Sequence, residues 1–582
     1  MNAERLLELY DRISEAPDAV SRLRRFVLDL AVRGKLVEQD PEDEPASELL
    51  ERIAAEKKRL VNAGQIRKVK PSPALNEDDI PFDLPHGWAW TQIADLGLVS
   101  PRNEAPDDQP ASFVPMPMIA SQYGVTNRHE PRAWKEIKKG YTHFAEGDVA
   151  LAKITPCFEN GKSTVFRNLA GGIGAGTTEL HVIRPLIVSA DYILLFVKTP
   201  HFIETGISKM TGTAGQKRVP KAYFTHSPFP LPPLAEQHRI VAKVDELMAL
   251  CDRLEETHNT REATRYRLTN ASLTRLTAPD TDEPTFQSHA RFALDTLPAL
   301  TTRPDQIKTL RRTILDLAVR GKLVEQNPRD TPASALLSKI REQRNELLAG
   351  EYPNTAEART QIKKLAKQQL SSQLPTLPSG WEWATLQQCS LLVVDCKNKT
   401  APYSSSGINL VRTTNVRNGR LNNTDQKYVT EATYKAWSVR CLPEPGDILI
   451  TREAPMGEVC LVPAGETVCL GQRMMLARLV PETIDPNFML YSLRDPRLME
   501  RVQDKPLGMT VQHLRVGGVE SLLVPVPPLA EQHRIVAKVD EFMVLCDRLE
   551  SNLETIDDKR GRLLDCLITE MSTSAAEEPE LV

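Results

Sequence analysis

Apolar residues recur at alternating spacings of four and three along two stretches of the chain, a pattern typical of a helix that buries one stripe. Polar residues interrupt the stripe at His258, Arg261 and Arg265 in the first stretch and at Arg560 in the second. The apolar positions are Ile240, Val244, Leu247, Cys251, Leu254 and Leu268, and then Ile535, Val539, Phe542, Cys546, Leu549, Leu553, Ile556, Leu563 and Leu567. This spacing predicts coiled-coil seams on two long helices, over residues 232–277 and 527–571.

These apolar positions serve either to pair the two helices or to dock partners. At 1.5 Å per residue, helices of about 40 residues are each about 60 Å long. We expect the two helices to pair antiparallel, which makes a rod with one globular domain near each end. The alternative is that each helix packs on its own domain or on a partner chain.

Elsewhere the pattern changes to short apolar runs punctuated by Gly, Pro and Asn, as in residues 148–154, 180–183, 446–451 and 469–480. These runs, with short helices at 190–198 and 486–493, predict globules over residues 80–231 and 375–526. Residues 1–79 and 306–374 have the pattern of helical lead-ins. Residues 278–305 have the composition of a linker, and the acidic tail 572–582 is expected to be disordered. The expected fold class is α+β: two α/β-type globules in a pseudo-two-fold internal repeat, joined by two long helices.

An internal repeat is the strongest feature of the sequence. Residues 28–39 and 315–326 both read LDLAVRGKLVEQ, and residues 232–246 and 527–541 both read PPLAEQHRIVAKVDE. A weaker likeness connects LPHGWAW (84–90) with LPSGWEW (377–383), and EGDVALAKITP (146–156) with PGDILITREAP (445–455). A period near 290 residues is too long for a solenoid and indicates a duplicated domain pair.

The two halves have kept their flanks nearly identical while their middles have diverged. Identical flanks suggest one task performed twice, such as docking two copies of a partner, and different middles suggest two related but distinct tasks. The alternative is that the flanks are a packed core that resists change. We favour docking because residues of polar type are repeated together with the apolar ones, namely Glu236, Gln237, His238, Arg239 and Lys243.

Composition indicates a globular protein of the cytoplasm. The net charge of −4 gives no bulk attraction for nucleic acid but permits a local basic face. The nine Cys form no CxxC pair, which argues against a disulfide framework or a zinc site. The N-terminus lacks the apolar core of a signal peptide, and no apolar run approaches the length of about 18 residues that spans a bilayer.

Catalytic motifs fail on inspection. The GKS at 161–163 has Pro156 where a phosphate loop needs Gly, and GGIGAGTTE (171–179) has Thr177 where a dinucleotide loop needs Gly. Asp395 and Lys397 form a D-x-K without a convincing upstream acid. Adenine-methyltransferase signatures, HExxH and a serine-nucleophile elbow are absent from the sequence. We therefore expect no enzyme activity in this chain.

The blocks LDLAVRGKLVEQDPEDEPASELLERI and PPLAEQHRIVAKVDELMALCDRLE resemble the specificity subunit of type I restriction–modification systems. The segment DCKNKTAPYSSSGINLVRTTNV is similar to the opening of that family's target-recognition domain. The resemblance covers nearly the whole chain and follows the family's order of parts, although the N-terminal lead-in is longer than in many relatives.

The resemblance implies a non-catalytic subunit that reads a two-part target in double-stranded DNA. Each globule reads one half-site, and the paired helices set the gap between the half-sites. Two modification subunits dock on the repeated helices, and motor-nuclease subunits join through them. S-adenosylmethionine, ATP and Mg²⁺ belong to those partners, and this chain itself holds no cofactor and no metal.

Two aligned loops are the first candidates for DNA contact, residues 211–221 and 507–516, in which Gln216 aligns with Gln512. Amide and forked side chains read bases, and Lys, Arg, Ser and Thr position phosphates. The alternative is that these are ordinary solvated side chains. The full set of candidates is Lys153, Thr155, Thr213, Gln216, Lys217 and Arg218 in the first globule, and Lys397, Arg412, Thr413, Asn415, Arg417, Arg452, Thr510, Gln512, His513 and Arg515 in the second.

Two other functions remain open at this point. A coiled-coil scaffold without DNA contact accounts for the seams equally well, and a stand-alone nuclease or methyltransferase needs unfamiliar motifs. His238 and His533 are expected to be surface or docking residues rather than metal ligands. Trp88, Trp90, Trp381 and Trp383 are expected to anchor the globules in their cores.

Overall fold

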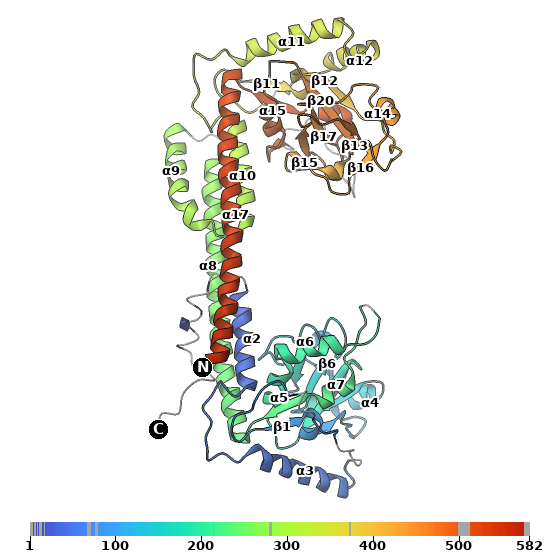
Figure 1. The fold of residues 1–582 in the computed structure, drawn as a ribbon, viewed down its shortest axis with the longest axis vertical. Coiled ribbons are helices and arrows are strands. Elements are labelled where there is room, and N and C mark those ends of the chain that lie inside the picture. Colours follow the sequence, from blue (N-terminus) through green and yellow to red (C-terminus); the bar gives the residue numbers. More distant parts are fainter. Residues whose placement is uncertain are drawn as a thin grey trace. The chain divides into compact units, whose positions relative to one another are not determined.

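The chain is a mixture of α-helices and β-strands, as the sequence predicts (Figure 1). The computed structural model describes all residues except 1–3, 5–6, 9, 11–13, 15, 17, 67–71, 76–79, 214, 279–281, 372–373, 499–512 and 575–582. The chain forms two compact units, one made of Met1–Glu262 with Ile556–Val582 and the other of Ala263–Thr555. Each unit contains one diverged middle segment, which we call the first globule (residues 80–231) and the second globule (residues 375–526).

The first unit opens with two helices, α2 (Ala19–Val32) and α3 (Ala46–Asn62), and then enters the first globule. One four-stranded sheet has the order β2-β9-β6-β7, and a second has the order β4-β3-β8-β5. The strands are β1 (Ala89–Gln92), β2 (Gly97–Val99), β3 (Pro110–Val114), β4 (Glu130–Ala133), β5 (Thr142–Ala145), β6 (Val149–Ala152), β7 (Ser163–Val165), β8 (Ile173–Gly176), β9 (Leu180–Pro185) and β10 (Pro228–Leu231). The helices of the globule are α4 (Trp134–Ile137), α5 (Ala190–Val197), α6 (Pro200–Lys209) and α7 (Lys221–His226).

The second unit repeats this plan with α10 (Pro304–Val319) and α11 (Ala333–Ala349) leading into the second globule, with α12 (Thr355–Leu365) added. Its main sheet has the order β12-β20-β17-β18, which matches β2-β9-β6-β7 of the first. The strands are β11 (Glu382–Thr385), β12 (Ser390–Asp395), β13 (Ile408–Val411), β14 (Val416–Arg417), β15 (Arg420–Leu421), β16 (Lys427–Val429), β17 (Ile448–Thr451), β18 (Val459–Leu461), β19 (Val468–Leu470), β20 (Met474–Leu479) and β21 (Leu523–Val526). The remaining helices are α13 (Leu386–Cys389), α14 (Glu431–Trp437), α15 (Pro486–Leu493) and α16 (Val516–Glu520).

Each globule is closed by one two-stranded sheet, β1–β10 in the first and β11–β21 in the second. These sheets bring the first and last strands of a globule together, so the chain leaves the globule beside the point where it entered. The exit strand runs directly into a long helix, α8 (Leu234–Leu276) or α17 (Leu529–Ser574). Each long helix begins in one unit and ends in the other.

The predicted seams are buried over the first turns of both long helices. Ile240, Val244 and Leu247 are fully buried against the first globule and α2, and Ile535 and Val539 are fully buried in the second unit. The polar contacts are repeated as well. Arg24 of α2 donates to Asp252 and Glu255 of α8, and its counterpart Arg311 of α10 donates to Asp547 and Glu550 of α17.

The seam prediction is wrong for helix pairing at Leu268, Ile556 and Leu563, which are 47%, 41% and 44% exposed. Leu564 and Leu567 are buried instead in the core around the start of α8, and Leu273 and Leu276 in the core of the second unit. A straight α-helix has 3.6 residues per turn and drifts by about 20° per heptad against a 3.5-residue repeat. The buried stripe therefore moves by about one residue along each helix. Leu553 is buried, and Leu254, Phe542 and Leu549 are partly buried.

The segment 278–305, which the sequence analysis assigned as a linker, contains the helix α9 (Glu283–Leu300). The Asp282 carboxylate caps the helix by accepting a hydrogen bond from the Thr285 backbone N–H at 2.8 Å, and Pro284 lies in the first turn. Ala293 and Leu297 pack against Leu273 and Leu276 of α8. The Asp and Pro that suggest a linker by composition here act as helix-start residues.

The glutamate of each PPLAEQ block, Glu236 in the first copy and Glu531 in the second, is buried, so its repetition has a structural explanation. Glu236 is 1% exposed and accepts a hydrogen bond from the Trp88 indole at 2.9 Å, and Glu531 is 1% exposed and accepts one from Trp381 at 3.1 Å. Burial raises the pKa of both carboxyl groups. Structure alone therefore accounts for the repetition of Glu236, and this residue no longer argues for partner docking.

The neighbouring glutamines connect the long helices to the globules in the same way. Gln237, fully buried, accepts a hydrogen bond from the Ser189 backbone N–H at the start of α5 and donates to the Pro232 carbonyl, both at 2.9 Å. Gln532 makes the same pair of hydrogen bonds with Asp485 and Pro527 at 3.0 Å. These contacts fix how each globule sits on the first turn of its own long helix.

The repeated Gly-Asp turn places one buried ion pair in each globule. Asp148 is fully buried, and the Arg184 guanidinium donates to both of its carboxylate oxygens at 2.8 and 2.9 Å. Asp447 and Arg478 form the same two-bonded pair at 2.8 and 2.7 Å. Asp148 also accepts a hydrogen bond from the Ala145 backbone N–H at 2.7 Å, which stabilises the turn.

We predict that Arg184→Met lowers the stability of the chain by about 3–5 kcal/mol, because it leaves a buried carboxylate without its cation. Burial raises the pKa of Asp148 by more than the Arg184 guanidinium lowers it, so the pKa is raised already in the wild type. Removing Arg184 removes the opposing effect and raises that pKa further. The folded variant then takes up a proton as the pH falls through the raised pKa, and its deficit against the wild type shrinks. Urea unfolding at several pH values measures both effects.

The matched control is Arg167→Met, which breaks a more exposed ion pair with Asp191. We expect its cost to stay below about 1 kcal/mol at every pH. An equal cost for the two variants, or a deficit of Arg184→Met that grows on acidification, contradicts the prediction.

Candidate nucleic-acid interface

Two candidate segments far apart in the sequence meet in the first globule. The loop between α6 and α7 lies against the residues that follow β6. The Thr155 backbone N–H donates to the Lys217 carbonyl at 3.0 Å, and the Val219 N–H donates to the Lys153 carbonyl at 2.8 Å. The sequence placed Lys153 and Thr155 beside a repeated turn and Gln216 to Arg218 in a separate loop. The fold brings them together as one surface.

Several candidate side chains on this surface already form hydrogen bonds or ion pairs with other residues of the globule. Arg218 makes a two-bonded ion pair with Glu179, both distances 2.9 Å, and this pair lowers the pKa of Glu179. The Lys153 ammonium donates to the Thr178 carbonyl at 2.8 Å, and the Thr155 hydroxyl donates to the Lys217 carbonyl at 3.2 Å. These residues shape the loops, and contact with DNA requires them to exchange or share their present partners.

Three candidates project from the same loop into solvent. Thr213, Gln216 and Lys217 are exposed, and within the described part of the chain none of their side chains has a hydrogen-bond or ion-pair partner. Lys221, at the start of α7, adds an exposed cation at the end of the same loop. An amide and two ammonium groups with free donors are suited to base edges and phosphates, respectively.

The second globule repeats the junction with different residues. The Leu514 backbone N–H donates to the Arg452 carbonyl at 3.0 Å, and His513 forms a β-bridge with Glu453. Arg515 is the residue that precedes α16. Thr510 and Gln512 lie outside the described residues, so they stay predictions.

Arg452 is not a surface side chain. Its side chain is 15% exposed, its guanidinium lies 3.5 Å from the Asp395 carboxylate, and it donates to the Leu514 carbonyl. The sequence pattern assigned it to DNA because it aligns with Lys153 after the repeated turn. In the fold, Arg452 instead forms an ion pair with the partly buried Asp395 carboxylate.

The polar cluster 412–417 is also engaged mainly with its own loop. Asn415 is 4% exposed and its amide donates to the Asn422 and Thr424 carbonyls. Arg412 pairs with Asp425, and Arg417 donates to the Thr413 carbonyl at 2.7 Å. Asn415 is therefore wrong as a direct DNA contact. Lys397 is exposed and lies over the Trp437 ring at 4.3 Å.

Arg420 is an exposed cation that the sequence analysis did not select. It lies on β15, directly after the tight turn formed by Asn418 and Gly419, whose φ angles are 52° and 82°. Asn-Gly is the strongest short signal for a two-residue hairpin turn, and it could have identified this projecting hairpin from the sequence.

The described part of the chain contains neither a cluster of potential metal ligands nor a helix able to span a membrane. No group of three or more His, Cys, Asp or Glu among the described residues is arranged to hold a metal ion. Among the helices whose residues are described, none has the length and apolar character needed to cross a bilayer. His238 and His533 are exposed, and His533 lies 3.9 Å from Asp485.

Comparisons with known proteins agree with the resemblance found in the sequence. Residues 167–263 and 382–555 match the family model of the type I restriction modification DNA specificity domain. The EcoAI specificity subunit of Escherichia coli is 38% identical over 557 residues, which covers 94% of this chain and 93% of the relative. The EcoEI specificity subunit of Escherichia coli is 37% identical over 572 residues, with 94% and 93% covered.

Among solved structures, the HsdS subunit from Thermoanaerobacter tengcongensis is 19% identical with a TM-score of 0.42, covering 84% of this chain and 97% of that one. The near-complete match to the curated relatives defines the class of protein as a DNA sequence-specificity subunit. The chain belongs to the family of type I restriction enzyme specificity subunits.

Lys217 is exposed, and we expect its ammonium group to contact a phosphate. We therefore predict that Lys217→Gln weakens binding of the full chain to duplex DNA about equally for all sequences. The slope of log K against log salt should fall by about 1. Fluorescence anisotropy of a labelled duplex across a salt series measures both quantities. Lys139→Gln, at an exposed lysine after α4, is the control and should leave the slope unchanged. Equal slopes for wild type and Lys217→Gln rule out the phosphate contact.

Proposed function

We propose that this chain gives a type I restriction–modification complex its DNA sequence specificity, and that each globule reads one half of a two-part double-stranded target. The observation that carries the proposal is the repeated frame with different loops. Both globules share the strand order of the main four-stranded sheet, the same Asp–Arg pair and the same anchor on a long helix. The residues carried at the matching loop junction differ between the two halves.

A shared frame with different loops suits two readers of different sequences. A rigid framework presents side chains at a defined place, and the side chains that it presents determine which base edges are bound. In the first globule the presented set includes Gln216 and Lys217, and in the second the corresponding junction carries His513 and Arg515. Two such readers in one chain account for a duplicated protein whose halves have diverged only between the flanks.

We further propose that α8 and α17 pair antiparallel and set the gap between the two half-sites. Support comes from each unit by itself, because each contains the beginning of one long helix and the end of the other. The exposed apolar residues on these helices are candidates for partner docking. They are Tyr266, Leu268, Val544, Leu545, Ile556 and Leu563.

On this proposal the chain is non-catalytic and all chemistry belongs to its partners. Two modification subunits bring S-adenosylmethionine and methylate the target, and motor-nuclease subunits bring ATP and Mg²⁺. The cytoplasm, where the genome is accessible, is the compartment that this function requires. A scaffold without DNA contact is not favoured, since it needs neither two globules nor their exposed Gln and Lys side chains.

We predict that exchanging residues 85–225 for the matching segment of another specificity subunit changes one half of the methylated target and leaves the other half and the gap unchanged. The measurement is modified-base sequencing of genomic DNA from cells that express the chain with its modification subunit. Cells that lack only this chain are the control, and they should show no motif. A change in both half-sites contradicts independent reading.

A second variant tests the helical ruler separately. Inserting or deleting whole helical turns in one long helix should change the gap and leave both half-sites intact. If the partner complex assembles and methylates without any motif that depends on this chain, the proposed function itself fails.

A further inference from the structure

A hairpin of the second globule places two arginines directly opposite each other. It consists of β14 and β15 with the turn Asn418–Gly419 between them, and Arg417 faces Arg420 across the two strands. Arg417 donates to carbonyls of its own loop, at 2.7 Å to that of Thr413. Arg420 is exposed, and no residue of the described chain forms a hydrogen bond or an ion pair with its side chain. Like charges directly opposite one another weaken a strand pair, so the stability of the hairpin does not account for this arrangement.

Arg494, the residue after α15, brings a third guanidinium to this hairpin. It packs against the backbone of Gly419, where a Cβ atom would lie 2.6 Å from the Nη1 atom of Arg494. Its side chain is partly buried and has neither a hydrogen-bond partner nor an ion-pair partner within the described ranges. Burial lowers the pKa of Arg494, and the charge of Arg420 lowers it further, although nearby acidic groups act in the opposite direction. A partly buried guanidinium without a partner costs free energy, and a bound anion removes this cost.

The Glu458 carboxylate lies near the hairpin but does not neutralise it. It accepts a hydrogen bond from the Asn418 backbone N–H at 3.0 Å, and among the residues that the structure describes it forms no ion pair. Glu458 is the last residue of the turn between β17 and β18, and Glu453 of the same turn forms a β-bridge with His513. The hairpin and the loop junction that we propose for DNA contact are therefore attached to one turn.

The first globule has a lysine in place of Arg494, and its own carbonyls satisfy that lysine. β3 pairs with β4 and β8 as β13 pairs with β16 and β19, so the loop between β3 and β4 corresponds to the loop that contains the hairpin. Lys198 ends α5 as Arg494 ends α15. Lys198 is 7% exposed, and its ammonium donates to the carbonyls of Ser121 and Gly161 at 2.8 and 3.0 Å. The corresponding loop exposes Val125, an apolar residue.

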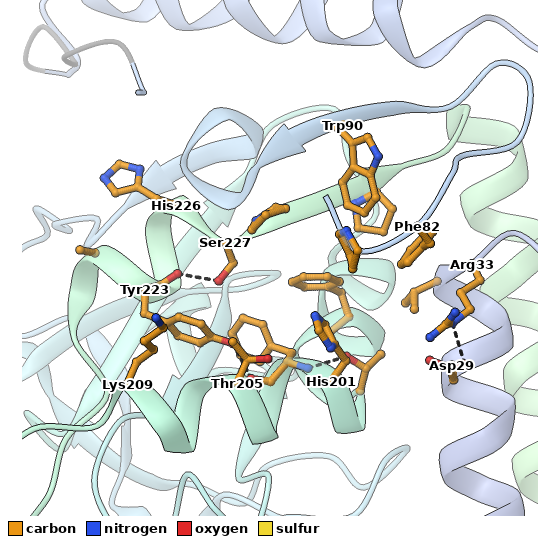
Figure 2. Close-up of a pocket in the computed structure, with 18 residues that line it drawn as sticks. Asp29, Arg33, Phe82, Trp90, His201, Thr205, Lys209, Tyr223, His226 and Ser227 are labelled. Atoms are coloured by element: carbon orange, nitrogen blue, oxygen red, sulfur yellow. Dashed lines mark hydrogen bonds and ion pairs between the residues drawn. The ribbon is translucent and has the colours of Figure 1, made fainter. Parts of the chain in front are cut away.

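The residues that follow Lys198 also differ in character from those of the hairpin site. They line a cavity of about 300 Å³ whose walls are largely aromatic, with Trp90 among them (Figure 2). Arg33 at this cavity is already paired with Asp29 at 2.8 Å. Lys209 adds a single exposed ammonium group at the end of α6. This part of the first globule therefore has no counterpart, among its described residues, of two adjoining unpaired guanidinium groups.

We propose that Arg420 and Arg494 bind one phosphate of the DNA backbone, and that this contact belongs to the second globule alone. The inference rests on the proposed function, since it names a DNA contact of one of the two reading globules. A guanidinium presents its N–H donors in a fork that matches two phosphate oxygens, and a second cation beside it strengthens the attraction. The phosphate neutralises Arg494 and relieves the repulsion between the arginines of the hairpin. Because phosphates carry no sequence information, the contact adds affinity and fixes the orientation of this globule on DNA.

Arginine modification of the full chain tests this assignment. Phenylglyoxal reacts with accessible guanidinium groups, and mass spectrometry of peptides gives the rate at each arginine. With free duplex DNA at about ten times its Kd, we expect Arg420 to react about tenfold more slowly than in the free chain. Arg359 on α12 is the internal control, because it is also exposed and has no partner in the part of the chain that the structure describes. Its rate should stay unchanged, and equal slowing of both arginines overturns the inference.

Fluorescence anisotropy of the labelled duplex in the same samples separates this inference from the proposed function. Bound duplex with an unprotected Arg420 overturns the inference and leaves the proposed function standing. If the chain binds no duplex, alone or with its modification subunit, the proposed function fails and the inference fails with it. Inorganic phosphate at the same concentration of phosphate groups is a further arm. Protection equal to that given by the duplex identifies a site for free anions and overturns the assignment to the DNA backbone.

Arg420→Gln provides a second test, since the side chain is exposed and its removal leaves no buried group unpaired. We expect the slope of log K against log salt to fall by about 1, equally for duplexes of different sequence. Arg359→Gln is the matched control and should leave the slope unchanged. An unchanged slope for Arg420→Gln, or a change confined to one duplex sequence, contradicts the backbone contact.

Discussion

The architecture depends on a small buried polar junction at the first turn of each long helix. A glutamate accepts from a tryptophan indole, and the next residue, a glutamine, connects the last strand to the start of a globule helix. An unpaired buried polar group costs about 1–3 kcal/mol, so every partner in the junction constrains the others. The candidate DNA-contacting loops can differ between the halves because this junction holds each globule on its helix without them.

The sequence predicts well those features that depend on local pattern and on the repeat. The long helices and the two globules follow from periodicity and from the repeated blocks, and the family follows from the resemblance of those blocks to known specificity subunits. The apolar repeat predicts burial less well toward the ends of the long helices, because the difference between 3.5 and 3.6 residues per turn adds up along a helix. Leu268 and Leu563 continue the 3.5-residue repeat in the sequence, but in a straight helix they face away from the core. Composition also does not indicate the helix within the segment 278–305, which starts at Asp282 and Pro284.

The candidate DNA-contacting residues fall into two groups, those that are exposed and those that are engaged by other residues of the globule. Gln216 and Lys217 stand out by residue type and are exposed in the fold, so they stay candidates for DNA contact. Arg218, Arg452 and Asn415 have equally suitable side chains, but the fold supplies Glu179, Asp395 and two backbone carbonyls as their partners. Such partners lie up to about 60 residues away in sequence, and no local pattern reveals them. Repeated polar residues are likewise ambiguous, as the buried Glu236 demonstrates.

The exchange of helix ends between the units has a consequence for biosynthesis. The ribosome delivers the chain from its N-terminus, and residues 1–262 emerge long before residues 556–582, which complete the same unit. Until Leu564 and Leu567 arrive, the hydrophobic core that they share with α2 and the start of α8 is incomplete. The first unit therefore reaches its final packing only after residues 556–582 have been made, whereas the second unit, built from the continuous stretch 263–555, can finish earlier. A nonsense mutation near the 3′ end of the reading frame thus damages the half of the protein that was made first.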